Sequence, residues 1–143
     1  MDATDEKLLN LVDSGTIKYT SLAKKLNMSL STVHFRLKKL EKDKVIKRYK
    51  GEIDWKKAGL PIMAFVLVNI RVNALKGMHK TQDMILKELI SIPYVKEGYI
   101  VTGDADILVR VMAKDTAHFK DILLNHIDAI DGVANANTIV VLD

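Results

Sequence analysis

Residues 20–49 constrain the fold more than any other part of the chain, because they contain two helical patterns separated by a short turn. The first pattern ends at Asn27, a residue type that tolerates the left-handed backbone conformation of a tight turn. The second continues to about Lys42, and its apolar positions, spaced four and three residues apart, are Val33, Leu37 and Leu40. Two helices joined in this way form a helix-turn-helix, which places its second helix in the DNA major groove.

Basic residues are concentrated around these helices. Residues 18–50 hold 11 Lys and Arg against 2 Asp and Glu. Residues 1–61 hold 14 against 8, whereas residues 62–143 hold 8 against 10. This asymmetry indicates a nucleic-acid-binding module joined to a second module of a different kind.

The composition bounds the remaining possibilities. A chain of 143 residues, 48% of them hydrophobic, forms one ordinary domain or two small ones. The absence of Cys excludes disulfides, thiolate zinc sites and thiol catalysis. No apolar run reaches the roughly 18 residues of a membrane-spanning helix, and the chain starts with acidic residues, so we expect a soluble, cytoplasmic protein. The Lys-rich composition, with Gln82 as the single glutamine, is compatible with a thermophile.

The helical patterns of the front half predict three helices. The first spans about Asp5–Ser14, the second Ser21–Leu26, and the third continues to about Lys42. Short polar residues precede each helix and are its expected N-caps, namely Thr4, Thr20, and Ser29 or Ser31.

A linker region follows the third helix. Residues 45–49 alternate apolar with basic side chains, which predicts a strand that serves as a small wing or a linker strand. A charged stretch ending in Gly and Pro then marks a boundary at residues 56–61. We therefore divide the chain into a helix-turn-helix domain (1–50), a linker strand or hinge (51–61) and a C-terminal domain (62–143).

The C-terminal domain is predicted to contain strand, helix, strand, strand, helix and strand, at residues 64–72, 79–90, 95–102, 107–113, 116–130 and 136–142. This order is typical of an α+β, ferredoxin-like βαββαβ sandwich. Helices cover one face of such a sheet, and a second copy of the chain is the simplest cover for the other. The apolar strand residues that lie on one face or the other include Val66, Val68, Ile70, Val109 and Val111. Three methionines are most simply core residues, namely Met78, Met84 and Met112.

Both halves resemble one known family, the Lrp/AsnC or feast/famine regulators, over essentially the whole chain. The front half carries the resemblance through Leu22-Ala-Lys-Lys-Leu26, Ser29-Leu-Ser-Thr-Val33, Arg36-Leu-Lys-Lys-Leu-Glu41 and Val45-Ile46-x-x-Tyr49. The back half carries it through Ile92-Pro93-x-Val95, Thr102-Gly-Asp-Ala-Asp106, Gly132-Val133 and Thr138-Ile-Val-Val141. The resemblance, with an archaeal source favoured, implies a DNA-binding transcription regulator with a small-molecule-binding domain. It further implies an amino-acid effector, no other cofactor, and homodimers that assemble into tetramers or octamers.

The helix-turn-helix frame nominates the residues that contact double-stranded DNA. Side chains near the start of the third helix can meet base edges, whereas basic side chains further along meet phosphates. The candidates are Thr20, Ser29, Ser31, Thr32, His34, Phe35, Arg36, Lys38, Lys39, Lys47 and Arg48. The alternative is an ordinary solvated charged face, and Phe35 has the further alternative of packing against Tyr49 or Leu22.

The loop between the second and third strands of the C-terminal domain is the candidate effector site. Taken alone, Gly-Asp-x-Asp between two strands is an ordinary hairpin turn. The family resemblance makes it a binding loop, in which a carboxylate accepts hydrogen bonds from the ammonium group of an amino acid. The residues implied are Thr102, Gly103, Asp104 and Asp106, with Asn135, Asn137 and Thr138 on the facing final strand. The four His residues show no metal-ligand spacing, and we expect no metal site.

Three functions remain in view. The leading one is a sequence-specific regulator of amino-acid or related metabolism and of its own gene, modulated by the effector. The second is a global, architectural DNA-packaging protein. The third is an enzyme similar to the sirohaem decarboxylases that resemble this family, although such an enzyme does not need a basic, exposed recognition helix.

Overall fold

A computed structural model describes residues 1–77 and 79–143, so Met78, expected in the core, lies outside the described residues. The chain forms two compact units, residues 1–53 and 54–143, and residues 54–61 of the expected linker group with the second unit. None of the helices in the described residues is long and apolar enough to cross a membrane.

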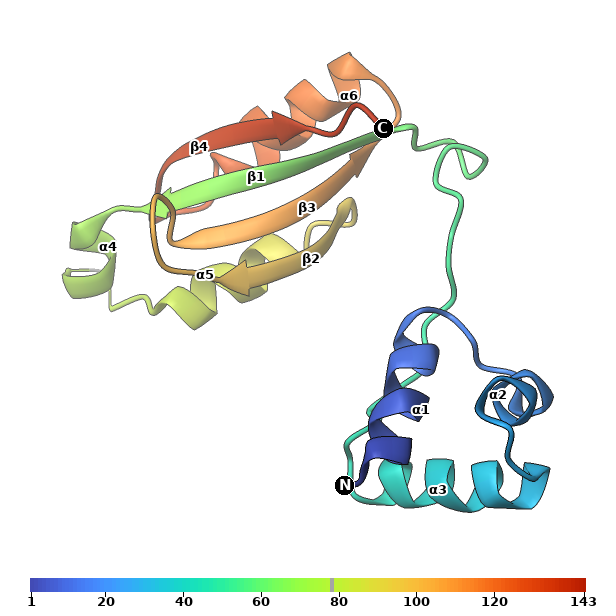
Figure 1. The fold of residues 1–143 in the computed structure, drawn as a ribbon. Helices are drawn as coiled ribbons and strands as arrows, with labels where there is room; N and C mark the ends of the chain where they lie inside the picture. The colour runs from blue at the N-terminus through green and yellow to red at the C-terminus, as the bar shows by residue number, and fades with distance from the viewer. Residues whose placement is uncertain (78) are drawn as a thin grey trace. The chain divides into compact units, whose positions relative to one another are not determined.

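The first unit is built from three helices, α1 (Ala3–Asp13), α2 (Tyr19–Leu26) and α3 (Leu30–Lys42) (Figure 1). The turn between α2 and α3 contains Asn27 in the left-handed conformation, with φ 52°, as expected for a helix-turn-helix. Ser29 caps α3 by accepting a hydrogen bond from the Thr32 amide. The apolar faces of the helices meet in one small core, made of Leu8, Leu22, Ala23, Val33, Leu37, Leu40 and Ile46.

Two of the predicted N-caps are wrong. The α1 helix is capped by Asp2, whose carboxylate accepts from the Asp5 amide at 2.8 Å while Asp5 reaches back to the Asp2 amide, so Thr4 lies inside the first turn. The α2 helix begins at Tyr19 after an extended Lys18, which places Thr20 inside that helix. The carboxylate of Asp2 suits the positive end of a helix dipole and extends α1 by two residues.

The predicted strand at residues 45–49 is also wrong, because residues 45–53 form no strand in the described part of the chain. The amides of Val45 and Ile46 both donate to the Leu40 carbonyl and close the end of α3. Ile46 is buried in the helical core. The alternating pattern therefore reflects one core anchor between exposed basic residues, and not a strand with a partner.

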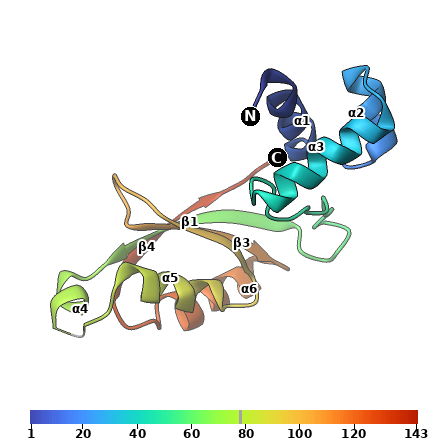
Figure 2. The same ribbon diagram turned by 90° about the horizontal axis from the view of Figure 1, so that it is seen from below.

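The second unit is a four-stranded antiparallel sheet with helices on one face (Figures 1 and 2). Its elements are β1 (Ile62–Ile70), α4 (Val72–Lys76), α5 (Gln82–Ile90), β2 (Val95–Ile100), β3 (Ile107–Ala113), α6 (Thr116–Asp121), the π-helical turn η1 (Ile122–Ile127) and β4 (Val133–Val140). The strand order β2-β3-β1-β4 is that of a ferredoxin-like sandwich, which confirms the predicted fold.

Helix boundaries in this unit differ from the prediction. The α4 helix was not expected, and it begins at Val72, which the sequence places in a strand. The α5 helix begins at Gln82, because Thr81 caps it by accepting from the Met84 amide. Met84 is 47% exposed and is therefore not a core residue, whereas Met112 is 3% exposed.

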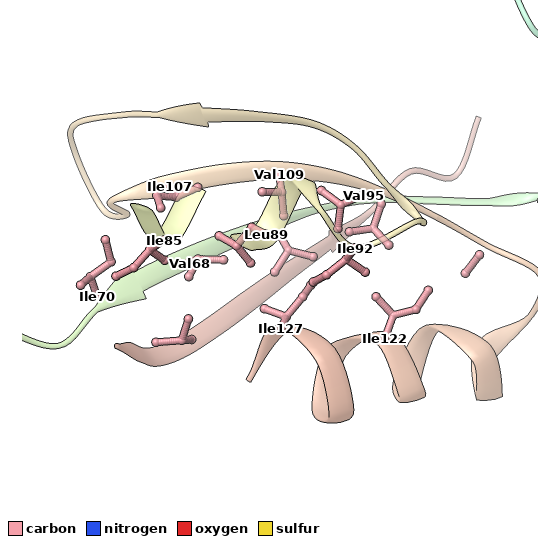
Figure 3. Packing of buried hydrophobic residues seen from close by; sticks show 14 of the residues in the cluster. Val68, Ile70, Ile85, Leu89, Ile92, Val95, Ile107, Val109, Ile122 and Ile127 are labelled. Atoms are coloured by element: carbon pink, nitrogen blue, oxygen red, sulfur yellow. The ribbon is translucent and has the colours of Figure 1, made fainter. Parts of the chain in front are cut away.

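The two faces of the sheet are chemically distinct. Figure 3 shows Val68, Val109 and their neighbours packed against Ile85 and Leu89 of α5 and against Ile122 and Ile127 of η1. All five apolar strand residues nominated by the sequence are buried on this face. The opposite face carries no helix among the described elements. We call it the open face. Its residues are Met63, Phe65, Leu67, Asn69, Glu97, Tyr99, Leu108, Arg110, Met112, Asn135, Asn137 and Ile139, of which Met112 is buried.

Candidate nucleic-acid interface and effector region

The outward face of α3 is the side of the helix opposite its buried apolar stripe. With about 3.6 residues per turn, the centre of this face is formed by Ser31, Phe35, Lys38 and Lys42. All four are exposed, and Phe35 is 70% exposed. Lys39 is exposed beside them. We call this set of five residues the recognition face.

Polar side chains at the start of α3 bond to one another. The Ser29 hydroxyl lies 2.7 Å from the Thr32 hydroxyl and 3.2 Å from the Ser31 hydroxyl. Thr32 is half-buried and its amide donates to Ser29 as well. Ser29 therefore caps the helix and is held by the Thr32 hydroxyl, and Ser31 is an exposed hydroxyl of this group.

The flank of α3 that faces α2 forms a shallow hollow. His34 makes an edge-to-face contact with Tyr19, with ring centroids 5.5 Å apart. Leu30, which is 50% exposed, contributes an apolar wall. The complete lining is Lys18, Tyr19, Thr20, Leu30, Ser31 and His34, which brings the expected DNA contacts Thr20 and His34 together.

The opposite flank of α3 is held by α1 through Arg36. Its guanidinium lies 2.8 Å from Asp2 and 3.0 Å from Asp5, so the phosphate contact expected from the sequence competes with two carboxylates. The hydrogen bond from Arg36 is the main cause that lowers the pKa of Asp2, and the same bond raises the pKa of Arg36. Arg36 thus joins the first helix to the third across the core.

Contacts at the end of α3 organise the segment that follows. The Tyr49 hydroxyl donates to Glu41 at 2.7 Å, and Lys38 lies 3.4 Å from the same carboxylate. Hydrogen bonding from Tyr49 is the main cause that lowers the pKa of Glu41. Lys47 and Arg48 are exposed just before Tyr49.

Phe35 does not take either of its alternative contacts. It is 70% exposed, whereas Tyr49 bonds to Glu41 and Leu22 is fully buried in the helical core. The packing alternative for Phe35 is therefore wrong, and its ring remains on the recognition face.

In the second unit, the β2–β3 loop is tied to the end of β1 through Asp106. The Asp106 carboxylate accepts from the Ile70 amide at 2.7 Å, and its own amide donates to the Val68 carbonyl at 3.0 Å. Thr102, Gly103 and Asp104 form the exposed tip. Gly103 has φ +118° and open space around its Cα, so a ligand can approach the backbone there.

The nominated residues of β4 divide between the two faces of the sheet. Asn135 pairs with Asn69 and accepts its side-chain N–H at 2.9 Å, close to the same end of β1. Asn137 lies on the open face opposite Leu67. Thr138 is opposite Val66 on the helix-covered face. The structure thus brings Asn135 toward the loop and turns Thr138 away from the open face.

Comparison with known proteins identifies both units. Residues 1–47 match a family model described as winged helix-turn-helix DNA-binding. Residues 63–143 match the Lrp/AsnC ligand binding domain. The chain belongs to the Lrp/AsnC family of transcription regulators. It is therefore a DNA-binding regulator with a ligand-binding domain.

Relatives of this Lrp/AsnC protein are similar over nearly its whole length. An uncharacterized HTH-type transcriptional regulator of Pyrococcus furiosus is 33% identical, covering 98% of this chain and 91% of the relative. The regulatory protein AsnC of Haemophilus influenzae is 28% identical, covering 98% and 90%. These relatives are regulators and not enzymes, so the prediction of a regulator is confirmed and the decarboxylase alternative has no support.

Solved structures show the same architecture. Escherichia coli AsnC aligns with a TM-score of 0.77 at 25% identity, covering 100% of this chain and 93% of that one. A transcriptional regulator of Neisseria meningitidis, solved as an L-Met complex, aligns with a TM-score of 0.79 at 25% identity, covering 100% and 90%.

Three residues of the helix-turn-helix unit of this Lrp/AsnC protein were not nominated from the sequence. Lys42 completes the recognition face, and Lys18 and Leu30 line the hollow beside it. The position of Lys42, seven residues after Phe35 and four after Lys38, is a signal that was available in the sequence. Lys18 and Leu30 are brought together only by the packing of α2 against α3.

Proposed function

We propose that this regulator recognises a pseudo-palindromic operator as a homodimer and represses or activates genes of amino-acid metabolism, including its own. The observation that carries the proposal is the recognition face, where a hydroxyl and an aromatic ring are surrounded by exposed lysines on a helix of the helix-turn-helix. Lysines supply phosphate contacts and salt-dependent affinity, whereas Ser31 and Phe35 face the base edges.

The open face supports the homodimer. Tyr99 and Ile139 are 54% and 55% exposed on it, beside the half-buried Phe65 and Leu67. An apolar sheet face of this kind is stabilised by covering it, and a twofold axis lets the same surface of a second copy do so. Pairing through this face makes one unit of a tetramer or octamer.

An amino acid is the proposed effector, bound at the tip of the β2–β3 loop. The exposed carboxylate of Asp104 can accept the ammonium group, and the open backbone at Gly103 lets the ligand carboxylate approach the loop amides. The L-Met complex of the Neisseria meningitidis relative supports this class of ligand. The effector acts by binding more tightly to one oligomeric assembly, or to one arrangement of the helix-turn-helix units, than to another.

Fluorescence anisotropy with the DNA upstream of the protein's own gene, against a scrambled duplex of equal length, tests the proposal at two salt concentrations. We expect preference for the upstream DNA, an affinity that falls with salt, and a response to added amino acids. Lys39→Ala should weaken binding and reduce the salt dependence, whereas the matched control Lys87→Ala, at an exposed position of α5 in the second unit, should not. Equal binding to both duplexes would favour the architectural function, and no binding at low salt would overturn the proposal.

A further inference from the structure

Phe35 is the most exposed aromatic side chain of the helix-turn-helix unit among the residues described. It is 70% exposed at the centre of the recognition face, with no place in the helical core. Water contact with an aromatic ring is unfavourable, so a ring held at the centre of a binding surface gains most when a partner covers it. The outward position of Phe35 on a basic helix face therefore favours a partner that presents an apolar group.

The surroundings of Phe35 restrict what that partner can be. Lys38, Lys39 and Lys42 are exposed on the same face, which favours a polyanion. Leu30, 50% exposed at the edge of the adjoining hollow, adds a second apolar point. In the major groove, the 5-methyl group of thymine is the apolar group that base edges present. The remaining base-edge groups are hydrogen-bond donors and acceptors, with which a phenyl ring forms no hydrogen bond.

We propose that Phe35 is a specificity-determining residue, which reads the 5-methyl group of a thymine in each half-site. This inference rests on the proposed operator binding. It goes further by assigning the selection of thymine to the side chain of Phe35. Ser31, one turn before Phe35, offers a hydroxyl to the neighbouring base edge. The lysines set affinity without selecting a base.

The test removes single methyl groups from the DNA. A duplex selected by the wild-type protein from a randomised pool is prepared with each thymine replaced, one at a time, by deoxyuridine, which keeps base pairing and every hydrogen-bonding group. Burial of one methyl group corresponds to about a fourfold change in affinity. We expect a weakening of about this size at one equivalent thymine in each half-site.

The variant Phe35→Ala should bind the thymine and deoxyuridine duplexes equally, because the coupling between ring and methyl is gone. Phe35→Leu should keep part of the discrimination, since it retains an apolar side chain. Lys39→Ala is the matched control. It should bind both duplexes more weakly and keep the wild-type ratio of the affinity for the thymine duplex to that for the deoxyuridine duplex. Circular dichroism confirms that each variant is folded, as expected for surface substitutions.

Two results would overturn the assignment to Phe35. One is a wild-type protein indifferent to every deoxyuridine replacement, and the other is an unchanged deoxyuridine effect in Phe35→Ala. Both leave operator binding intact. Failure of the randomised pool to yield any preferred sequence would instead overturn the proposed operator binding on which this inference rests.

Discussion

Substitution of Asp106 separates a structural role from a ligand-binding role in the β2–β3 loop. The carboxylate accepts a 2.7 Å hydrogen bond from the amide of Ile70, a residue that is 8% exposed. Asp106→Ala leaves that amide without its acceptor, which costs about 1–3 kcal/mol of unfolding free energy. Asp106→Asn keeps an acceptor oxygen and should lose about 1 kcal/mol or less.

Urea unfolding followed by tryptophan fluorescence measures this loss. Trp55 is the single tryptophan and belongs to the second unit, where the Lys96 ammonium lies 4.9 Å from its ring centroid. A lower midpoint at constant slope reports a change in stability. Asp104→Ala is the matched control, because Asp104 is exposed at the loop tip, and its midpoint should not move.

The effector assay completes the comparison. Asp104→Ala should lose the amino-acid response while it keeps DNA binding and stability. If Asp106→Ala instead kept the wild-type midpoint and lost the response, the carboxylate would be a ligand contact and the reasoning from its hydrogen bond would be refuted.

Three further substitutions test the stability of the helix-turn-helix unit and of the second unit. Arg36→Ala should destabilise the first unit at neutral pH. Because the folded-state pKa of Asp2 is lowered, the part of this difference that comes from the Arg36–Asp2 pair is fully present above the ordinary value of 3.8. It is lost as pH falls through the lowered pKa, as circular dichroism at several pH values would show. Leu37→Ala, fully buried, should cost about 2–5 kcal/mol and abolish DNA binding without shifting Trp55 fluorescence. Gly132 has φ +107°, and a Cβ added there would lie 2.9 Å from Ile85 Cδ1. Gly132→Ala should therefore lower the free energy of unfolding of the second unit by about 1–3 kcal/mol, seen as a lower urea midpoint of Trp55 fluorescence. An unchanged midpoint contradicts the strain argument.

Periodic patterns predicted well the elements whose apolar faces are continuous. The α3 helix ends at Lys42 as expected, and β3 has the predicted bounds 107–113. Strong local signals also held, including Asn27 at the turn and Ser29, one of the two expected caps of α3. These features depend on interactions within a few residues, which a sequence displays directly.

Features that depend on a distant partner were not predicted. The alternation at residues 45–49 resembles a strand, but a strand needs a neighbour, and the apolar Ile46 closes the helical core instead. Arg36 was assigned to phosphates from its charge, because nothing local shows that Asp2 and Asp5 lie within 3.0 Å of it.

The candidate sites divide in the same way. Residue types and spacing were sufficient to place a basic recognition helix before a ferredoxin-like domain, because helix periodicity and charge are local properties. Only the packed structure showed that Phe35 remains outside the core, that Asp106 braces the end of β1, and that Thr138 faces the helices while Asn135 and Asn137 share the open face. Register and side-chain orientation depend on contacts between residues far apart in the chain, and those contacts exist only after the strands pair and the helices pack.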